Sequence, residues 1–291
     1  AWDESIHRWV ALKFLKNEEE FNLQLFRREA RMVGRLSHPH IIPIHEMGIL
    51  GKHHYIAMKF VEGATLREYV RQDGRLLAGL IRDAAEALEY AHQNDVIHRD
   101  IKPTNFLVEE HSSTRPTETP PRNSRLGHHI YVADFGLAKQ VSVDSSLSIS
   151  GSLVGTPAYM SPEQANGKNE RIDAATDIYS LGATLYELLS GHPPFAGNTI
   201  YDLLKAILEE EPTPLRKKYP GIDQDLETIV MKCLRKEPEN RYRTAGELAV
   251  DLDCYLQQEP LEHARPVTFG YRIRKRIQKQ PLLWSVTFAF I

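Results

Sequence analysis

The most constraining feature of this 291-residue chain is a polar octet, His98-Arg99-Asp100-Ile101-Lys102-Pro103-Thr104-Asn105, which is followed by Asp134-Phe135-Gly136. The short spacing between Asp100 and Asn105 lets one polar loop hold a hydroxyl group and a metal ion. Asp134 follows an apolar run typical of a buried strand, and a carboxylate there can hold a metal that bridges phosphates. The two strings together therefore predict a site that binds metal-bridged phosphates.

In this order, the two strings resemble the catalytic loop and metal-binding motif of the eukaryotic-type protein kinase family, in particular its bacterial serine/threonine branch. The resemblance covers about residues 1–257. It implies an α+β, two-lobed fold, with a small antiparallel sheet and one helix preceding a larger helical lobe. It also implies an enzyme that uses ATP with Mg2+ or Mn2+ to phosphorylate serine or threonine in protein substrates.

Composition agrees with an ordinary globular protein, since 42% of residues are hydrophobic and 26% are charged. The net charge of −3 gives no overall field that favours nucleic acid. Cys233 and Cys254 lie in helical apolar patterns and are predicted to be buried, reduced thiols. The pairs His53-His54 and His128-His129 have no partners at zinc-ligand spacing and are interpreted as surface residues.

Hydrophobic patterns divide the chain into two parts. Residues 9–15 alternate as a strand does, a helical pattern ends near Gly34, and strands are expected over 41–49 and 55–60. This gives a small lobe over 1–62. Helical stripes then dominate 63–257, including one over 77–91, one over 177–189 that is apolar on more than one side, and one over 224–234. Thr244 and Glu247 predict a capping box for the last helix.

Residues 109–128 are polar, rich in proline and without periodicity. They separate two short strand-like runs that kinases join by a tight turn. We expect a disordered loop inserted there. A tolerated surface insertion explains it, and a docking or phosphorylation segment is the alternative.

The resemblance assigns catalytic roles residue by residue. Asp100 would accept the proton of the substrate hydroxyl, and Lys102 would stabilise the γ-phosphate. Lys13, in Val10-Ala11-Leu12-Lys13, would contact the α- and β-phosphates and be held by Glu29. Asn105 and Asp134 would bind the metal.

The same resemblance outlines an adenine pocket. Ala11 would form its roof, Leu107 its floor and Met58 its back wall. The backbones of Lys59 and Val61 would bond the base. Family members often have Glu where Lys59 stands, a departure expected to matter little because backbone groups do the bonding.

Residues 134–163 resemble an activation segment. Its serine-rich middle predicts autophosphorylation on Ser148 or Ser150, with Ser152 ranked behind them, and Arg99 could pair with the phosphate. Thr156 would shape the peptide site. Three further residues would be structural supports: a buried Glu163–Arg241 ion pair, and Asp177 bonding the backbone at His98 and Arg99.

Both ends of the chain suggest a longer protein. The Gly-rich loop of kinases is missing, so we expect it upstream, and we expect weak ATP affinity from this fragment. Residues 258–280 form a basic juxtamembrane segment, and 281–291 resemble the start of a transmembrane helix. The layout implies a cytoplasmic kinase domain of a single-pass membrane protein. The alternative is an apolar tail packed on the domain.

Two other functions compete with a protein kinase. A pseudokinase scaffold would bind partners without transferring phosphate, but it usually lacks one of the residues assigned above. A kinase of aminoglycosides or choline has a similar fold but usually lacks the peptide-site segment that resembles residues 155–163. The branch also allows a homodimer through the small lobe.

Overall fold

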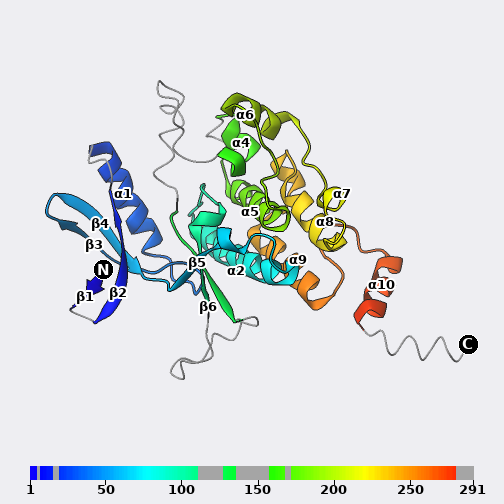
Figure 1. Ribbon diagram of the computed structural model, residues 1–291, viewed down its shortest axis with the longest axis horizontal. Coiled ribbons are helices and arrows are strands. Elements are labelled where there is room, and N and C mark those ends of the chain that lie inside the picture. The colour runs from blue at the N-terminus through cyan, green and yellow to red at the C-terminus, as the bar shows by residue number, and fades with distance from the viewer. Residues whose placement is uncertain (5–6, 16–19, 111–126, 136–156, 168–171, 280–291) are drawn as a thin grey trace, which may run out of the picture.

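The strand pattern at residues 9–15 becomes β2 (Arg8–Phe14), one of four antiparallel strands in the order β1-β2-β4-β3. The others are β1 (Trp2–Asp3), β3 (Ile44–Leu50) and β4 (His53–Lys59). Helix α1 (Glu20–Val33) packs Phe26 and Ala30 against Ile56 of β4. This sheet and helix form the first lobe, and the helical second lobe lies beside it (Figure 1).

The computed structural model describes the whole chain except residues 5–6, 16–19, 111–126, 136–156, 168–171 and 280–291. The side chains of 20–22, 25, 29 and 276–279 are also outside the description.

A second sheet joins the two lobes. It has the order β5-β6-β7 and consists of β5 (Gly63–Thr65), β6 (Phe106–Glu110) and β7 (His128–Val132). The loop after α1 reaches this sheet, because Ile41 forms a parallel bridge with Val132. The insertion predicted over residues 109–128 is too long at both ends. Glu109 and Glu110 belong to β6 and His128 belongs to β7, and Glu110 pairs with His128 in the ladder between these strands. The charged and imidazole side chains at these strand ends hid the strand pattern, because they pair with residues on other elements, as Glu109 does with Lys59.

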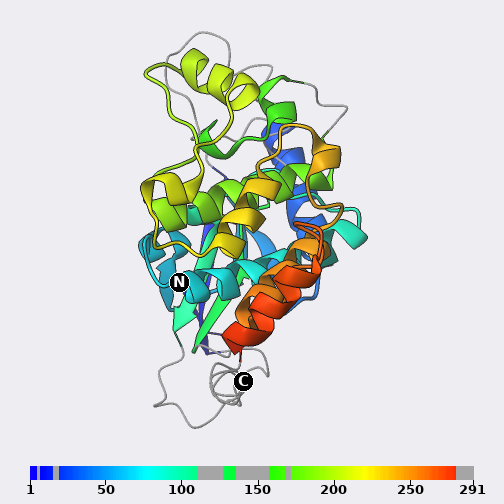
Figure 2. The same ribbon diagram turned by 90° about the vertical axis from the view of Figure 1, so that its right-hand side faces the viewer.

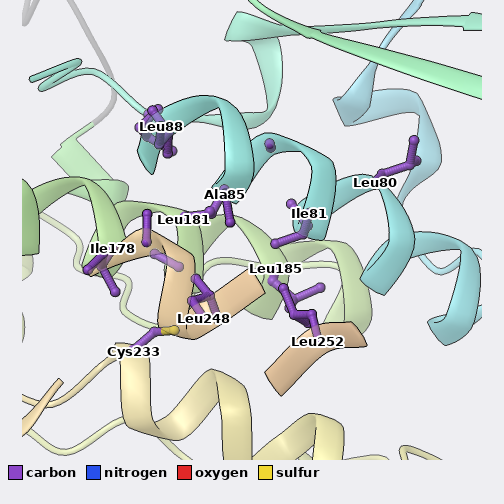
Figure 3. Close-up of a cluster of buried hydrophobic side chains, with 14 of the residues drawn as sticks. Leu80, Ile81, Ala85, Leu88, Ile178, Leu181, Leu185, Cys233, Leu248 and Leu252 are labelled. Atoms are coloured by element: carbon purple, nitrogen blue, oxygen red, sulfur yellow. The ribbon is translucent and has the colours of Figure 1, made fainter. Parts of the chain in front are cut away.

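Four helices build the core of the second lobe. They are α2 (Gly74–Gln93), α5 (Ala174–Ser190), α8 (Gln224–Cys233) and α9 (Ala245–Gln257). Figure 3 shows Ile81, Leu181 and Leu248 between α2, α5 and α9. Helix α5 is buried around most of its circumference, and Gly191 ends it in a left-handed conformation.

Other helices complete the lobe. These are the α-helices α4 (Pro162–Ala165), α6 (Ile200–Glu209), α7 (Leu215–Lys218) and α10 (Phe269–Lys279), and the 3-10 helices η1 (Leu66–Tyr69), η2 (Pro103–Asn105), η4 (Pro157–Tyr159) and η6 (Pro238–Asn240). Helix α10 lies at the end of the molecule remote from the first sheet, and Figure 2, viewed from that end, shows it in front of α9.

The chain remains attached to the second lobe beyond Gln257. The buried carboxylate of Asp251 accepts the backbone N–H groups of Glu262, His263 and Ala264 at 2.6–3.0 Å. Among the described residues, no helix has the length and apolar composition needed to cross a bilayer. The predicted transmembrane start at 281–291 lies outside them.

Three smaller expectations have clear outcomes. Cys233 and Cys254 are free and buried, as predicted. The surface assignment is wrong for His129, which is 4% exposed because its ring stacks on His40 at 4.5 Å. Thr244 caps α9 by accepting the Glu247 N–H at 3.2 Å. The predicted capping box is only half formed, because the Glu247 carboxylate accepts the N–H of Arg243, at 3.0 Å, instead of that of Thr244.

Candidate active site

The polar octet folds into a loop that places two functional groups, an ammonium and an amide, against one carboxylate. Lys102 Nζ and Asn105 Nδ2 each lie 3.0 Å from Asp100 Oδ2, and Asn105 Nδ2 also donates to the Asp100 carbonyl at 2.7 Å. Pro103 begins the η2 turn that brings Asn105 back towards Asp100. The Asp100 side chain stays 19% exposed, so a hydroxyl group can reach it.

The buried carboxylate of Asp177 holds the backbone of this loop in place. Asp177, in the first turn of α5, accepts the N–H groups of His98 and Arg99, each at 2.8 Å. His92 Nε2 lies 2.8 Å from the same carboxylate. Burial by itself would raise the pKa of Asp177, but the contacts with His92 and His98 hold that pKa below its ordinary value.

Arg99 is held in a strained conformation next to the catalytic position. Its φ of +66° lies in the left-handed region, which a non-glycine residue occupies at a cost. Asp177 binds its N–H, and Gln164 Nε2 donates to its carbonyl at 2.9 Å. The surrounding structure therefore holds both peptide groups of Arg99 in place.

Sequence reasoning missed two of these contributors. His92 follows Leu88 by four residues on the apolar stripe of α2, so a polar residue on a buried face was the signal. Gln164 gave no signal, because its contact with Arg99 crosses 65 positions.

His98 and Phe135 pack together behind the site. His98 is fully buried, its ring centroid lies 4.5 Å from that of Phe135, and its Nε2 donates to the Ala133 carbonyl at 3.0 Å. Burial lowers the pKa of His98, which favours the neutral ring. This pair links the catalytic loop to the residues that follow β7, among them Asp134.

Lys13 of β2 reaches Asp134 across the two lobes, with Lys13 Nζ 3.0 Å from Asp134 Oδ1. The predicted partner, Glu29, lies in α1, but its side chain is outside the description. Asp134 has a φ of +56°, a left-handed conformation that aspartate tolerates better than most residues. Positive φ values therefore occur at both Arg99 and Asp134, as is common at functional sites.

Two of the residues assigned to the adenine pocket, Ala11 and Met58, share one face of the first sheet. Ala11 lies directly opposite Met58, and Lys13 opposite Ile56, in the β2–β4 ladder. Met58, Val61 and Leu107 all pack against a buried cluster of Ile42, Tyr131 and Ala133. A small cavity of about 20 Å³ borders this face, and Lys13, Met58, Asp134 and Phe135 contribute to its lining.

Lys59 does more than provide backbone groups. Its N–H is donated to the Pro43 carbonyl at 2.9 Å. Its ammonium lies 3.2 Å from Glu109 Oε2, hydrogen-bonds the Tyr131 hydroxyl and sits over the Tyr131 ring. The side chain therefore ties β4 of the first lobe to β6 and β7.

The donor set suits a hard divalent cation. Because Asn105 Nδ2 points at Asp100, its amide oxygen is directed elsewhere, and Asp134 adds carboxylate oxygens. Asn105 and Asp134 are neighbours through the backbone, since the Ala133 N–H donates to the Asn105 carbonyl at 2.9 Å. Amide and carboxylate oxygens are the ligands that Mg2+ prefers.

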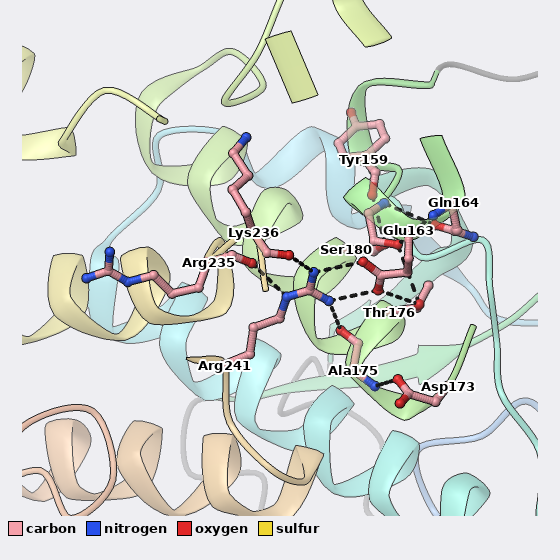
Figure 4. A network of polar contacts seen from close by, with 11 residues as sticks. Tyr159, Glu163, Gln164, Asp173, Ala175, Thr176, Ser180, Arg235, Lys236 and Arg241 are labelled. Atoms are coloured by element: carbon pink, nitrogen blue, oxygen red, sulfur yellow. Dashed lines mark hydrogen bonds and ion pairs between the residues drawn. The ribbon is translucent and has the colours of Figure 1, made fainter. Parts of the chain in front are cut away.

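A buried ion pair supports the segment that would form the peptide site. Arg241 and Glu163 make two parallel hydrogen bonds of 2.8 Å, and Thr176 Oγ1 donates to the same carboxylate at 2.7 Å (Figure 4). Such a two-bond pair fixes both position and orientation. Thr156, Ser148, Ser150 and Ser152 lie outside the described residues.

Arg99 also presents unused donors. Its Nε and Nη1 atoms are buried and lack a hydrogen-bond partner within the described part of the chain. Burial lowers the pKa of Arg99, and the nearby charge of Arg28 on α1 lowers it further. The nearby carboxylate of Asp177 opposes this decrease in pKa.

Comparison with known proteins agrees with this geometry. The protein kinase domain family matches residues 1–250, and the chain belongs to that family. The serine/threonine-protein kinase PknB of Mycobacterium leprae is 37% identical over 280 residues, which are 92% of this chain and 42% of that protein. The serine/threonine-protein kinase PrkC of Bacillus subtilis is 35% identical over 274 residues, 91% of this chain and 39% of that protein.

A solved structure shows the same fold. The crystal structure of Rad53 1-466 in complex with AMP-PNP superposes with a TM-score of 0.62 at 25% identity, covering 84% of this chain and 57% of that one. The α+β, two-lobed architecture expected from the sequence is confirmed. The chain spans less than half the length of the curated relatives described above.

Proposed function

We propose that this chain is the catalytic domain of a serine/threonine protein kinase that transfers the γ-phosphoryl group of ATP to protein hydroxyls. The main support for the proposal is that two sets of residues with complementary chemistry are brought into contact. Asp100, Lys102 and Asn105 meet on one loop, and Lys13 meets Asp134 across the lobes. The named relatives, PknB and PrkC, are serine/threonine-protein kinases.

The roles of these residues follow from their chemistry. Asp100 orients the attacking hydroxyl and accepts its proton, while Lys102, 3.0 Å away, neutralises charge on the transferred group. Lys13 leaves the Asp134 carboxylate for the α- and β-phosphates when nucleotide binds, and Glu29 supports it. Phosphoryl transfer needs alignment and charge stabilisation rather than a covalent intermediate, and these residues supply both.

Asn105 and Asp134 would hold Mg2+ or Mn2+. The cation supplies positive charge that offsets the phosphate oxygens. Ala11, Met58 and Leu107 would enclose the adenine ring, with the backbone at Lys59 and Val61 bonding its edge.

Regulation by autophosphorylation is part of the proposal. The buried donors of Arg99, with Arg28 nearby, form a site that an anionic group would satisfy. A phosphate on Ser148 or Ser150 would supply that charge, and Thr156 would shape the peptide site beside Asp100. Such a contact would connect α1 to the catalytic loop.

The location of the protein is also proposed. Residues 258–291 would lead from the kinase domain into a membrane span, which would place the domain in the cytoplasm. The protein would act on protein substrates in transmembrane signalling and could pair as a homodimer.

The proposal is tested by measuring phosphoryl transfer from labelled ATP by the full-length protein. The protein is incubated with γ-labelled ATP, Mg2+ and a generic protein substrate, beside an Asp100→Asn variant whose binding of an ATP analogue is measured separately. We expect label on serine or threonine with the wild type and at least about a thousandfold less with the variant.

Two outcomes would contradict the proposal. Equal labelling by wild type and variant would remove Asp100 from the mechanism, and no labelling despite ATP binding would favour a pseudokinase scaffold. Transfer to an aminoglycoside or choline, but not to protein, would favour a small-molecule kinase.

A further inference from the structure

A second cluster of potential metal ligands lies outside the active site, where the loop after α1 meets α2. It consists of His40 on the loop and of Asp83 and Glu86 on α2. One ligand atom from each residue lies within 4.8 Å of the other two. His40 and Asp83 are buried and Glu86 is half-buried, so the cluster is shielded from solvent.

His40 is held in a fixed orientation. The backbone around it joins β7, because the Val132 N–H donates to the His40 carbonyl at 2.8 Å and the Ile42 N–H donates to the Val132 carbonyl at 3.0 Å. The His40 ring stacks on His129 with centroids 4.5 Å apart. The residue is 5% exposed, so its ring has little freedom to rotate.

The hydrogen bond of His40 defines which ring nitrogen is available. His40 Nδ1 lies 3.0 Å from the Ile130 carbonyl oxygen. A carbonyl only accepts, so Nδ1 donates this hydrogen bond and Nε2 is the ring nitrogen available to a metal ion. Nε2 lies 3.9 Å from Asp83 Oδ2, which is beyond hydrogen-bonding distance.

Asp83 and Glu86 bring negative charge to the same point. They are three residues apart on α2 and so share a helix face. Asp83 Oδ1 accepts two hydrogen bonds from Arg82, at 2.6 and 2.9 Å, which leaves Oδ2 directed at His40. One ligand atom of Glu86 lies within 4.8 Å of those of His40 and Asp83, so both carboxylates approach the same imidazole.

We propose that His40, Asp83 and Glu86 bind a divalent transition-metal ion of the Zn2+ class, which clamps the loop after α1 to α2. A ligating histidine typically donates its other ring N–H to a backbone carbonyl, and His40 does so. One imidazole nitrogen with two carboxylates suits Zn2+ better than Mg2+ or Ca2+, which prefer oxygen alone. Metal–ligand bonds of about 2 Å require only small side-chain movements from the present spacing.

The site would have a structural consequence for the kinase fold. The loop of His40 belongs to the first lobe, whereas α2 is the helix that precedes the catalytic loop in the second lobe. A metal at this point would hold the two lobes together independently of nucleotide.

The test measures Zn2+ binding to the chelator-treated protein. Zinc content after dialysis, titration calorimetry with ZnCl2 and the visible absorption of a Co2+ substitute are compared among the wild type, His40→Gln and Glu86→Gln. Exposed residues provide matched controls, His53→Gln and Glu209→Gln. MgCl2 at the same concentration tests selectivity.

We expect the wild type and both controls to bind one Zn2+ per chain that His40→Gln and Glu86→Gln lose or bind at least about tenfold more weakly. The Co2+ spectrum of that site should be that of low coordination. If both ligand variants match the wild type in zinc content and affinity, the proposal is overturned. If His40→Gln fails to fold, the zinc affinity of Glu86→Gln tests the proposal by itself, because Glu86 is half-buried and glutamine has the same shape.

Discussion

Arg241 and Glu163 form an ion pair in which every donor of the guanidinium group has an acceptor. Two N–H groups bind the two Glu163 oxygens at 2.8 Å, and the other three donate to the carbonyls of Arg235, Lys236 and Ala175 at 2.8–2.9 Å. The pair is 0% and 5% exposed at its side chains. It fixes the segment beside the proposed peptide site to the connection between α8 and α9.

Removing one member of this pair should destabilise the domain strongly. Arg241→Met would leave the Glu163 carboxylate buried without its cation, at a cost of about 3–5 kcal/mol. Urea unfolding followed by circular dichroism measures the loss, and the exposed Arg243→Met should change stability by less than about 0.5 kcal/mol. The double variant Glu163→Leu/Arg241→Met should recover part of the loss, and a double variant as unstable as the sum of the singles would contradict this account.

The same carboxylate should contribute to acid sensitivity. Burial alone would raise the pKa of Glu163, but the bonds from Arg241 and Thr176 hold it below its ordinary value. Because the folded pKa lies below the unfolded one, Glu163 contributes stability at neutral pH that is lost as pH falls through the folded pKa. Unfolding free energy measured from pH 7 to pH 3 should fall less steeply in Glu163→Gln than in the wild type, and parallel curves would show that this group does not titrate as described.

Gly182 should tolerate no side chain. It lies in the middle of α5, where an added Cβ would come within 2.3 Å of Cys233 Cβ on α8. Gly182→Ala should therefore cost about 1–3 kcal/mol through overpacking, despite the better helix propensity of alanine. Gly270→Ala is the matched control, because nothing lies within 4 Å of its Cβ position. Thermal unfolding distinguishes them, and equal effects would mean that α5 and α8 are less closely packed than here.

Lys59 and Glu109 should be energetically coupled across the lobes. Their charged atoms lie 3.2 Å apart, and each side chain is no more than a third exposed. Lys59→Glu would place like charges together and should cost about 1–3 kcal/mol, whereas Lys59→Glu/Glu109→Lys should restore much of it. A double-mutant cycle by urea unfolding gives the coupling energy, and a value near zero would show that Lys59 does not connect the lobes energetically.

Sequence patterns are sufficient to predict features that depend on residues close together in the chain. The octet at 98–105 places Asp100, Lys102 and Asn105 within one loop, so their meeting follows from local geometry. The strands at 44–50 and 53–59 and the stripes of α2 and α5 follow from periodicities of 2 and 3.6 residues. These features need no knowledge of the tertiary structure.

Contacts between distant segments could not be predicted in the same way. His129 looked like a surface residue because nothing nearby in sequence reveals that His40 stacks on it across 89 positions. Lys59 was considered only for its backbone, since its side-chain partner Glu109 lies on another sheet. The resemblance supplied the long-range pairing of Glu163 with Arg241, which no local pattern would have given.

Asp225 should control the attachment of α10 to the second lobe. Arg265 Nη2 and Lys275 Nζ lie 2.8 and 2.5 Å from its two carboxylate oxygens, and the Lys275 side chain is only 8% exposed. Asp225→Asn would remove the negative charge that compensates both cations, so α10 should detach while α5 stays folded. Hydrogen exchange read by mass spectrometry should become at least about tenfold faster over residues 269–275 and remain unchanged over 178–188.

The matched comparison uses two cations of the same helix. Lys275→Met should speed exchange of α10 because it removes the buried contact with Asp225, whereas Arg272→Met should not, since Arg272 is exposed. Unchanged exchange in both Asp225→Asn and Lys275→Met would show that α10 is held by other contacts, such as the Tyr271 hydroxyl that accepts the Leu261 N–H at 3.1 Å. Detachment would instead show that one carboxylate on α8 determines whether the basic segment stays on the kinase domain or is available to an anionic surface.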